Sequence, residues 1–376
     1  MTIADFIIIG GGIAGASAGY ELCRHGKVIL LEKENLPGYH TTGRSSAIFQ
    51  KSYNRGDPLL NILVTASEDF LRRPPADFAA RSLLTPRPLI YIAPPGQQDS
   101  LDNLRQKLGE IDITTDFISG QEITDVIPVL SPQYQDRALL EQGLADIDVG
   151  ALHGGYLQGI TARGGSIITN AGVTGLGRNN DRWQVTTKTG QFQAPVIINA
   201  AGAWVDRVAG LANIAPIGIR PLRRTVIMVT LPDDICPDSW PIVMDVSENY
   251  YFKPEGGKIL MTPGDATLSP PCDAQPEEID IAWAAHYLEQ ATRLKVSRIA
   301  RRWAGLRNHV ADGHPVAGFD AHAPGFFWLA GQGGFGIKTA PAMGRITASL
   351  ITGGRLPQDI TGRGLTRDRI SVKRLR

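Results

Sequence analysis

The sequence predicts an α/β protein of two domains, one built on a parallel sheet and one an α+β domain with a mixed or antiparallel sheet. Its 376 residues exceed what one hydrophobic core usually organises. An apolar strand, a glycine-rich turn, a helix and a second strand occupy residues 5–31, which is how a parallel sheet begins. Residues 219–306, in contrast, are rich in short β patterns that one helical stretch interrupts.

The first domain is expected to be Rossmann-like and to combine residues 1–82, 147–218 and 309–376. Apolar runs and stop signals predict strands at 5–9, 28–31, 166–169, 196–200 and 326–330, and helices at 14–25, 59–71 and 148–163, with a last helix ending near 351. A hairpin is expected around Thr189-Gly190, between 183–188 and 191–193. The basic residues from Arg363 onward are expected to form a solvated tail.

The second domain is expected to combine residues 83–146 and 219–308, so that the chain enters it twice. Its predicted strands are 89–93, 225–231, 250–253 and 258–261. Ser119 and Glu122 have capping-box spacing and predict a short helix that stops before Pro128. A longer helix is predicted at 277–292.

Composition and charge narrow the possible partners and location. The 38 basic and 37 acidic residues give a net charge of +1, so neither nucleic acid nor an anionic membrane is expected as a partner. No apolar run reaches the roughly 18–20 residues of a membrane span, and no basic leader of a signal peptide is present. Cys23, Cys236 and Cys272 are far apart and lack metal-ligand spacing, so we expect a reduced cytoplasmic location and no metal.

The strongest motif is Gly10-x-Gly12-x-x-Gly15, which follows a predicted strand and opens a helix. Gly10 permits a tight turn, Gly12 lets the backbone touch a pyrophosphate, and Gly15 lets the helix pack close to the strand. The helix N-terminus then offers free N–H groups and partial positive charge to the phosphates. Glu32 ends the next strand and would accept hydrogen bonds from ribose hydroxyls. The motif predicts a dinucleotide site but does not by itself choose between NAD and FAD.

Further segments accompany this motif: HTTGRS at 40–45, IINAAGAW at 197–204 and GQGGFG at 331–336. Together with residues 5–33 they resemble the D-amino acid oxidase (DAO) family of flavoproteins over nearly the whole chain. The resemblance implies the two-domain, glutathione-reductase-like fold of that family, and FAD as the cofactor. Some amine oxidases attach FAD to a cysteine near the position of 307–312, and no cysteine is present there, so we expect non-covalent FAD.

The resemblance also implies which residues contact FAD. Val173 would meet the adenine, Arg44 and Ser45 would lie near the flavin and its pyrophosphate, and the helix N-terminus at 333–337 would stabilise the negative charge of the reduced flavin. The full predicted set is Gly10, Gly12, Ile13, Ala14, Gly15, Glu32, Lys33, Thr42, Gly43, Arg44, Ser45, Val173, Ala201, Gly202, Trp204, Gly333, Gly334, Phe335, Gly336 and Ile337.

For a substrate carboxylate, arginine is the natural anchor because its fork makes two parallel hydrogen bonds. The family pattern selects Arg224 and Arg307, whereas Arg223 should point to the other face of its strand. Tyr53 and Tyr251 match family tyrosines that close the pocket, and Tyr53 lies in a segment, 46–56, that resembles a mobile loop with Gly56 as a hinge.

Residues 85–88, 303–307 and 310–313 are similar to the bacterial D-arginine dehydrogenases of this family. Two positions depart from that branch. Where those dehydrogenases have an acidic residue that pairs with the substrate guanidinium, this sequence has Leu89. Where they have a histidine in the loop, it has Ile48. Both changes remove polar partners for a cationic side chain, so we expect neutral, apolar or aromatic substrate side chains instead.

The expected activity is oxidative deamination of a D-amino acid to a 2-oxo acid and ammonia, with Tyr53, Arg224, Tyr251 and Arg307 as catalytic residues. Sarcosine or glycine oxidation, 2-hydroxy acid oxidation and a non-catalytic flavin-binding subunit stay open as alternatives. The electron acceptor, oxygen or a quinone-type carrier, also stays open. His309 follows Arg307 closely, but a place at the flavin is the less favoured interpretation for it, and His314 is expected to be structural.

Overall fold

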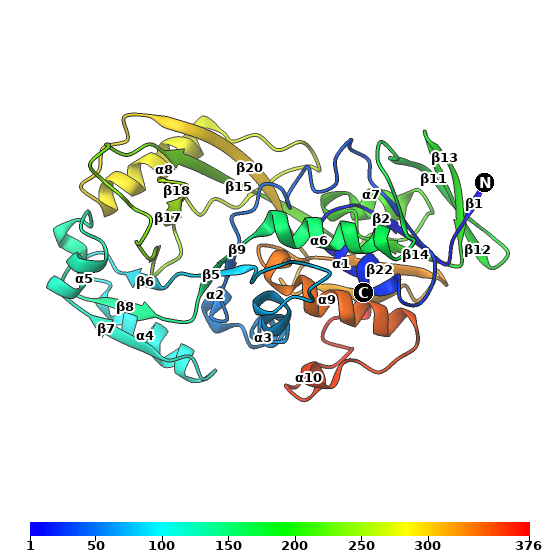
Figure 1. The fold of residues 1–376 in the computed structure, drawn as a ribbon, viewed down its shortest axis with the longest axis horizontal. Coiled ribbons are helices and arrows are strands. Elements are labelled where there is room, and N and C mark those ends of the chain that lie inside the picture. Colours follow the sequence, from blue (N-terminus) through cyan, green and yellow to red (C-terminus); the bar gives the residue numbers. More distant parts are fainter.

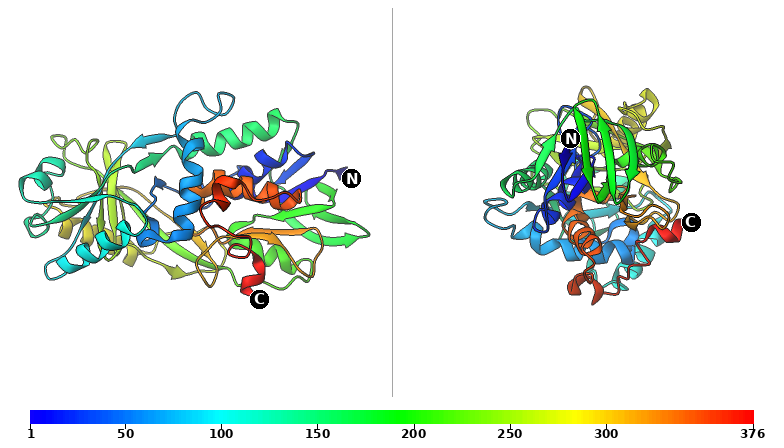
Figure 2. Two further views of the ribbon diagram at one scale, coloured as in Figure 1. Left: turned by 90° about the horizontal axis from the view of Figure 1, so that it is seen from below. Right: turned by 90° about the vertical axis from the view of Figure 1, so that its right-hand side faces the viewer.

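The computed structural model describes residues 1–376 and has the predicted α/β architecture, with two large sheets along the long axis of the molecule (Figures 1 and 2). A small sheet of β4 (Ile48–Phe49), β9 (Ala145–Ile147) and β5 (Leu84–Pro86) lies between them. The predicted crossings of the chain near 82 and 146 fall beside β5 and β9, while the assignment of whole segments to domains stays a prediction. None of the helices is both long enough and apolar enough to cross a bilayer.

The six-stranded sheet confirms the parallel arrangement predicted for the first half of the fold. Four neighbouring pairs are parallel, and only the last pair is antiparallel. Its order is β10 (Ser166–Ile168), β3 (Val28–Leu31), β2 (Phe6–Ile9), β14 (Val196–Asn199), β22 (Phe326–Ala330) and β21 (Val316–Phe319).

Alternation along β2 separates two cores. Phe6 and Ile8 face helices, whereas Ile7 and Ile9 face the opposite side, where a second sheet packs. The helical side holds α1 (Ile13–Leu22), α3 (Pro58–Arg72), α6 (Val149–Ala162) and α9 (Gly336–Ile351). The other side holds the sheet of β1 (Thr2–Ile3), β13 (Gly190–Ala194), β12 (Arg182–Thr187) and β11 (Val173–Asn179), together with α7 (Val205–Gly210).

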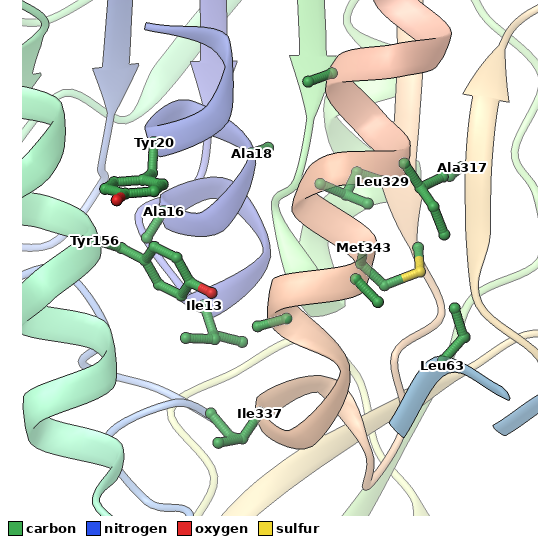
Figure 3. Packing of buried hydrophobic residues seen from close by; sticks show 14 of the residues in the cluster. Ile13, Ala16, Ala18, Tyr20, Leu63, Tyr156, Ala317, Leu329, Ile337 and Met343 are labelled. Atoms are coloured by element: carbon green, nitrogen blue, oxygen red, sulfur yellow. The ribbon is translucent and has the colours of Figure 1, made fainter. Parts of the chain in front are cut away.

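Helix α1 packs between α6 and α9, and small residues set how closely (Figure 3). A β-carbon at Gly344 of α9 would lie only 2.8 Å from the carbonyl oxygen of Ser17 on α1. Tyr20 of α1 and Tyr156 of α6 pack edge to face, with ring centroids 5.4 Å apart. The close approach of α9 to α1 brings the N-terminal ends of the two helices to the same edge of the sheet.

The nine-stranded sheet confirms the mixed or antiparallel sheet predicted for the second half. Only β16 and β6 pair in parallel. Its order is β19 (Thr267–Leu268), β15 (Arg220–Val229), β18 (Lys258–Thr262), β17 (Tyr251–Glu255), β16 (Ile242–Asp245), β6 (Leu89–Ile92), β8 (Ala138–Glu141) and β7 (Thr115–Ile118), with β20 (Ile299–His309) paired to β15. The remaining elements are α2 (Tyr53–Gly56), α4 (Gln98–Gly109), α5 (Gln121–Val126), α8 (Glu278–Ala291), α10 (Gln358–Thr361) and short 3-10 turns at Pro132–Tyr134, Gly202–Trp204 and Val372–Leu375.

The C-terminal segment corrects the prediction of a solvated tail. Leu365, Ile370 and Val372 are fully buried between the basic residues. Arg374 pairs with Asp312, its Nε lying 2.6 Å from Oδ2, and Arg376 lies 2.7 Å from a carboxylate oxygen of Asp320. The apolar residues, which the basic composition obscures, therefore hold the end of the chain against the sheet.

Candidate active site

A single cavity of about 540 Å³ joins the glycine motif to the paired arginines. Its floor is formed where the parallel strands β2, β3, β14 and β22 end, since Ile9, Leu31, Ala200 and Ala330 all line it. Ligands in open α/β sheets bind at this carboxyl edge. The β15–β20 pair and the segment 38–54 form further walls of the cavity.

The three motif glycines each meet a different steric demand. Gly10 has φ 112°, and a β-carbon there would lie 2.4 Å from the Ala200 carbonyl oxygen. At Gly15 a β-carbon would lie 2.0 Å from the Gly10 carbonyl oxygen, so this glycine permits the close packing of helix on strand. Gly12, which lines the cavity, has only the Thr42 hydroxyl nearby, at 3.3 Å from such a β-carbon. Gly12 therefore leaves open space where a ligand can approach the backbone.

Glu32 is held at one end of the cavity by backbone groups. Its carboxylate accepts hydrogen bonds from the N–H of Gly11 (2.8 Å) and of Glu34 (2.9 Å), and its side chain is buried. Nearby, the Lys33 ammonium lies 3.7 Å from the centre of a Trp204 ring. Val173, Gly172 and Ala171 line the same region.

Arg44 lines the cavity, and its guanidinium is bound by protein groups. Its Nη1 donates to the carbonyl oxygens of Ala274 (2.8 Å) and Ala304 (2.9 Å), and Nη2 pairs with Asp273. The indole N–H of Trp303 in turn donates to the Arg44 carbonyl oxygen (3.0 Å). The charge of Arg44 is thus engaged by protein groups, and the residue fastens the segment around it to the strand β20.

The segment that leads into α9 forms part of the cavity wall, and Gly333 separates His309 from the cavity. Gly333 has φ 39°, and a β-carbon on it would lie 2.4 Å from the imidazole of His309. The imidazole therefore packs behind the Gly333 backbone and does not line the cavity. Burial, together with Arg307 and Arg224, lowers the pKa of His309 to about 4, so this side chain is neutral. His314 has structural contacts, as predicted: its Nε2 lies 2.9 Å from Asp57 Oδ2.

The register of β15 and β20 brings two arginines to one face. Arg224 lies opposite Gly305 and Arg307 opposite Leu222, so the two arginines are diagonal neighbours on the same side of the sheet. Both line the cavity. Arg223 points to the other face, as expected, where it pairs with Glu277 and Asp280 beside α8.

Neither cavity arginine has a close carboxylate partner. Arg307 makes no ion pair or side-chain hydrogen bond, and Arg224 Nε is buried without a hydrogen bond, 3.9 Å from Asp265 Oδ1. Burial, together with the Arg307 charge, lowers the pKa of Arg224 to about 10. Two guanidinium groups with only one long carboxylate contact between them favour an anionic ligand in this cavity, because a carboxylate would relieve their repulsion and satisfy their donors.

Tyrosines close the arginine end of the cavity. A β-carbon at Gly334 would lie 2.4 Å from the Tyr53 hydroxyl and 2.9 Å from Arg307 Cζ, so these groups converge on one backbone position. Tyr251, on β17, also lines the cavity. The backbone after Tyr53 is left-handed at Asn54 and Arg55 as well as at the predicted hinge Gly56. Such strain at an active-site loop is consistent with a segment that changes conformation.

Most of the predicted site residues line this cavity, and four do not. Gly15 packs inside the fold, Phe335 is buried in the core, and Gly43 faces a neighbouring polar cavity. Leu89 was predicted to line the substrate pocket, but it is fully buried in an apolar cluster together with Ile48. Of these two residues, only Ile48 lines the cavity. Sequence reasoning missed several lining residues, namely Gln50, Val226, Met244, Glu248, Asn308, Gln332 and Lys338.

These features agree with comparisons to known proteins. Residues 5–350 match the DAO family of FAD-dependent oxidoreductases. The chain belongs to the DAO family.

Its relatives cover almost the whole of this DAO-family chain. Glycine oxidase from Geobacillus kaustophilus is 22% identical over 96% of the chain and 97% of its own length. Monomeric sarcosine oxidase from Bacillus sp. (strain B-0618) is 21% identical over 95% and 94%. The crystal structure of that glycine oxidase superimposes with a TM-score of 0.83, at 20% identity over 98% and 99% of the two chains. The FAD-bound L-α-glycerophosphate oxidase of Mycoplasma pneumoniae also has a TM-score of 0.83, at 20% identity over 94% and 95%.

The protein is FAD-dependent, and the cavity fits that cofactor. The glycine turn and the α1 N-terminus suit a pyrophosphate, and Glu32 suits a ribose. Buried polar atoms without partners also lie at the cavity wall: His40 Nδ1, Asn308 Oδ1 and Gln332 Nε2. A bound ligand can satisfy such atoms. None of the three cysteines lines the cavity, and non-covalent binding of FAD stays a prediction.

Proposed function

We propose that this flavoprotein oxidises the Cα–N bond of a D-amino acid to give a 2-oxo acid and ammonia. The observation that carries the proposal is one cavity that connects the dinucleotide motif with two guanidinium groups, of which Arg307 has no ion pair and Arg224 has only a long one, to Asp265. An amino acid carboxylate would be bound there by Arg224 and Arg307. Two relatives, glycine oxidase and monomeric sarcosine oxidase, are named after small amino acids, which supports an amine as the oxidised group.

The protein's part in this reaction is binding and orientation. Arg224 and Arg307 would fix the carboxylate, while Tyr251 and backbone carbonyls beside Gly334 would orient the neutral amine. FAD, when bound, supplies the acceptor for the hydride that leaves Cα. Tyr53 would cover the substrate and exclude water, since its loop borders the cavity. The imine released would then hydrolyse in water.

We further propose a preference for neutral, apolar side chains. Ile48, Val226 and Met244 line the cavity near Arg224 and Tyr251 and offer no hydrogen-bond partner to a cation. The wall holds two acidic residues: Glu32 belongs to the dinucleotide motif, and Glu248 lies 3.8 Å from the guanidinium of Arg55 and is half exposed. The D configuration rests on the likeness of residues 85–88, 303–307 and 310–313 to the D-arginine dehydrogenases.

The separate positions of Leu89 and Ile48 give a testable prediction. Leu89→Ala is expected to destabilise the fold by about 2–5 kcal/mol, because it removes a fully buried side chain, while leaving the ratio of kcat/KM for D-leucine and D-arginine unchanged. Ile48→Ala is expected to change that ratio, because Ile48 borders the substrate end of the cavity. Chemical denaturation and steady-state kinetics of both variants would measure this. A changed ratio in the Leu89 variant alone would contradict the assignment.

The activity itself is tested by anaerobic reduction of the flavin. D-leucine, L-leucine, D-arginine, sarcosine and D-lactate are added separately to the purified holoenzyme, and the flavin absorbance is followed. We expect D-leucine to bleach the flavin faster than D-arginine, and L-leucine not to bleach it. Readmitting air then separates an oxidase from a dehydrogenase, since only an oxidase passes its electrons rapidly to oxygen.

Other outcomes would replace the proposal. Bleaching by sarcosine alone would assign the protein to secondary-amine oxidation, and bleaching by D-lactate alone would assign it to 2-hydroxy acid oxidation. If D-arginine gave the highest kcat/KM of these compounds, the proposed preference for apolar side chains would be wrong. No bleaching by any amine or hydroxy acid would favour a flavin subunit without its own substrate.

A further inference from the structure

Lys338 is a buried lysine that the proposed function leaves without a role. It lies in the first turn of α9, two residues after Gly336, and its side chain is only 3% exposed. It lines the cavity, where its ammonium nitrogen lies 4.0 Å from the centre of the Tyr53 ring. It has no hydrogen bond and no ion pair with any other side chain. A buried amine that faces a ligand cavity without a partner is available to react with the ligand.

The surroundings of Lys338 disfavour its charged form. It is enclosed, it sits at the positive end of α9, and Arg307 is close by. Burial and the Arg307 charge lower the pKa of Lys338 to about 7, although Glu141 and Glu248 oppose the shift. At neutral pH a substantial part of the protein therefore carries a neutral amine here, with a lone pair free to accept a proton.

Glu141 is the buried counterpart of this lysine. It accepts hydrogen bonds from the hydroxyls of Ser52 (2.7 Å) and Tyr91 (3.0 Å), and the Gln50 amide donates to Ser52 (3.0 Å). No cation is within ion-pair distance of its carboxylate. Burial raises the pKa of Glu141 to about 7, and the Lys338 charge opposes that rise. Protonation of Lys338 thus favours ionisation of Glu141, in the same direction as the larger effect of the hydrogen bonds from Ser52 and Tyr91.

We propose that Lys338 is the base that accepts the proton of the substrate's ammonium group, with the Glu141 network supplying the counter-charge. The inference rests on the proposed function. The substrate N–H bond breaks, its electron pair stays on the substrate nitrogen, and the proton forms a new bond to Lys338 Nζ. This step changes no oxidation state, and it produces the neutral amine that hydride transfer requires. Binding of the carboxylate between Arg224 and Arg307 favours the transfer, because it neutralises charge beside the new ammonium.

The first test is the pH dependence of anaerobic flavin reduction by D-leucine. In the wild-type holoenzyme, the rate constant divided by the substrate dissociation constant should rise with pH and level off above about 7, because Lys338 must be neutral to act. In Lys338→Met and Lys338→Gln the rising limb should move to the higher pKa of free D-leucine's ammonium group. The value at pH 7 should fall about 100-fold or more and recover at high pH. Lys295→Met, an exposed lysine on the surface, should behave as wild type.

A second variant should shift the profile in the opposite direction. Glu141→Gln keeps an acceptor for Ser52 and Tyr91 but removes the negative charge that raises the pKa of Lys338. The rising limb should therefore move to lower pH. A purely structural role of Lys338 does not predict opposite shifts in these two variants.

A binding measurement gives a readout without turnover. The probe is 4-methylpentanoate, which is leucine without its amine. Its carboxylate should raise the pKa of Lys338, so binding at pH 8 to the oxidised holoenzyme should take up a proton from the buffer. Calorimetry in buffers of different ionisation enthalpy measures this uptake, which should disappear in Lys338→Met.

Two different failures are distinguishable. If D-leucine reduces the flavin and the Lys338 variants keep the wild-type pH profile and proton uptake, Lys338 is not the base while the proposed function stands. If no amine reduces the flavin of a folded holoenzyme, the proposed function fails, and the role of Lys338 toward an ammonium group fails with it.

Discussion

Arg307→Met is expected to lower kcat/KM for D-leucine by about 100- to 10,000-fold. Removing one partner of a buried, hydrogen-bonded charge pair typically costs about 3–5 kcal/mol, and each ~1.4 kcal/mol corresponds to a factor of ten. Arg307 makes no other ion pair, so its expected role is to bind the substrate and not to hold the fold. The thermal stability of the variant should therefore change little or rise, because an unpaired and partly buried charge is removed.

A second variant of Arg307 tests whether the shape of the guanidinium group matters in addition to its charge. Arg307→Lys keeps the charge but loses the fork that binds both carboxylate oxygens, so it should retain only part of the activity. Arg302→Met is the matched control, since Arg302 lies on the same strand, is half exposed and pairs with Glu278. If Arg307→Met kept a kcat/KM within threefold of the Arg302 control, the carboxylate would be bound elsewhere.

The parts of the fold that follow from local pattern were predictable. The strand at Phe6–Ile9, the glycine turn and helix α1 follow one another within a few residues, and each has its own signal. The face of Arg223 was predictable too, because side chains alternate along a strand whatever the strand packs against. Helix α4 was missed although Leu101, Leu104 and Leu108 have helical spacing, whereas strand β20 lacked a clear signal. Arg301 and Arg302 interrupt the apolar pattern of β20. Its pairing with β15 joins segments far apart in the sequence, which a local pattern does not reveal.

The site was predictable where it depends on a motif and not where it depends on three-dimensional packing. Leu89 follows the expected strand entry, but whether Leu89 or Ile48 reaches the cavity depends on how β6 and β4 pack. Arg44 is engaged by carbonyls more than 200 residues away in sequence, which no local pattern reveals. Lys338 could have been noticed in the sequence, because it is the one charged residue among the apolar and small residues of 335–344. Its burial and lack of partners could be seen only in the structure.

Gly12→Ala and Gly15→Ala are expected to separate FAD binding from folding. Gly12 has an extended backbone, φ −73° and ψ −179°, that alanine adopts readily, and an added methyl would meet only the Thr42 hydroxyl. The methyl would occupy space where the backbone meets the cofactor. Gly12→Ala should therefore weaken FAD binding by about tenfold or more, or about 1.4 kcal/mol, with little effect on the stability of the protein without FAD.

Gly15→Ala acts on the protein itself. Its methyl would lie 2.0 Å from the Gly10 carbonyl oxygen, and neither the helix nor the strand can yield without moving the other. Overpacking of this kind costs about 1–3 kcal/mol or more, so the melting temperature should fall even without FAD. Thermal unfolding of both variants at rising FAD concentration separates the two effects, because the stabilisation by ligand reports the dissociation constant. Wild-type FAD affinity in Gly12→Ala would contradict the proposed approach of the pyrophosphate to this backbone, whereas a lower melting temperature of that variant without FAD would show that Gly12 also serves the fold.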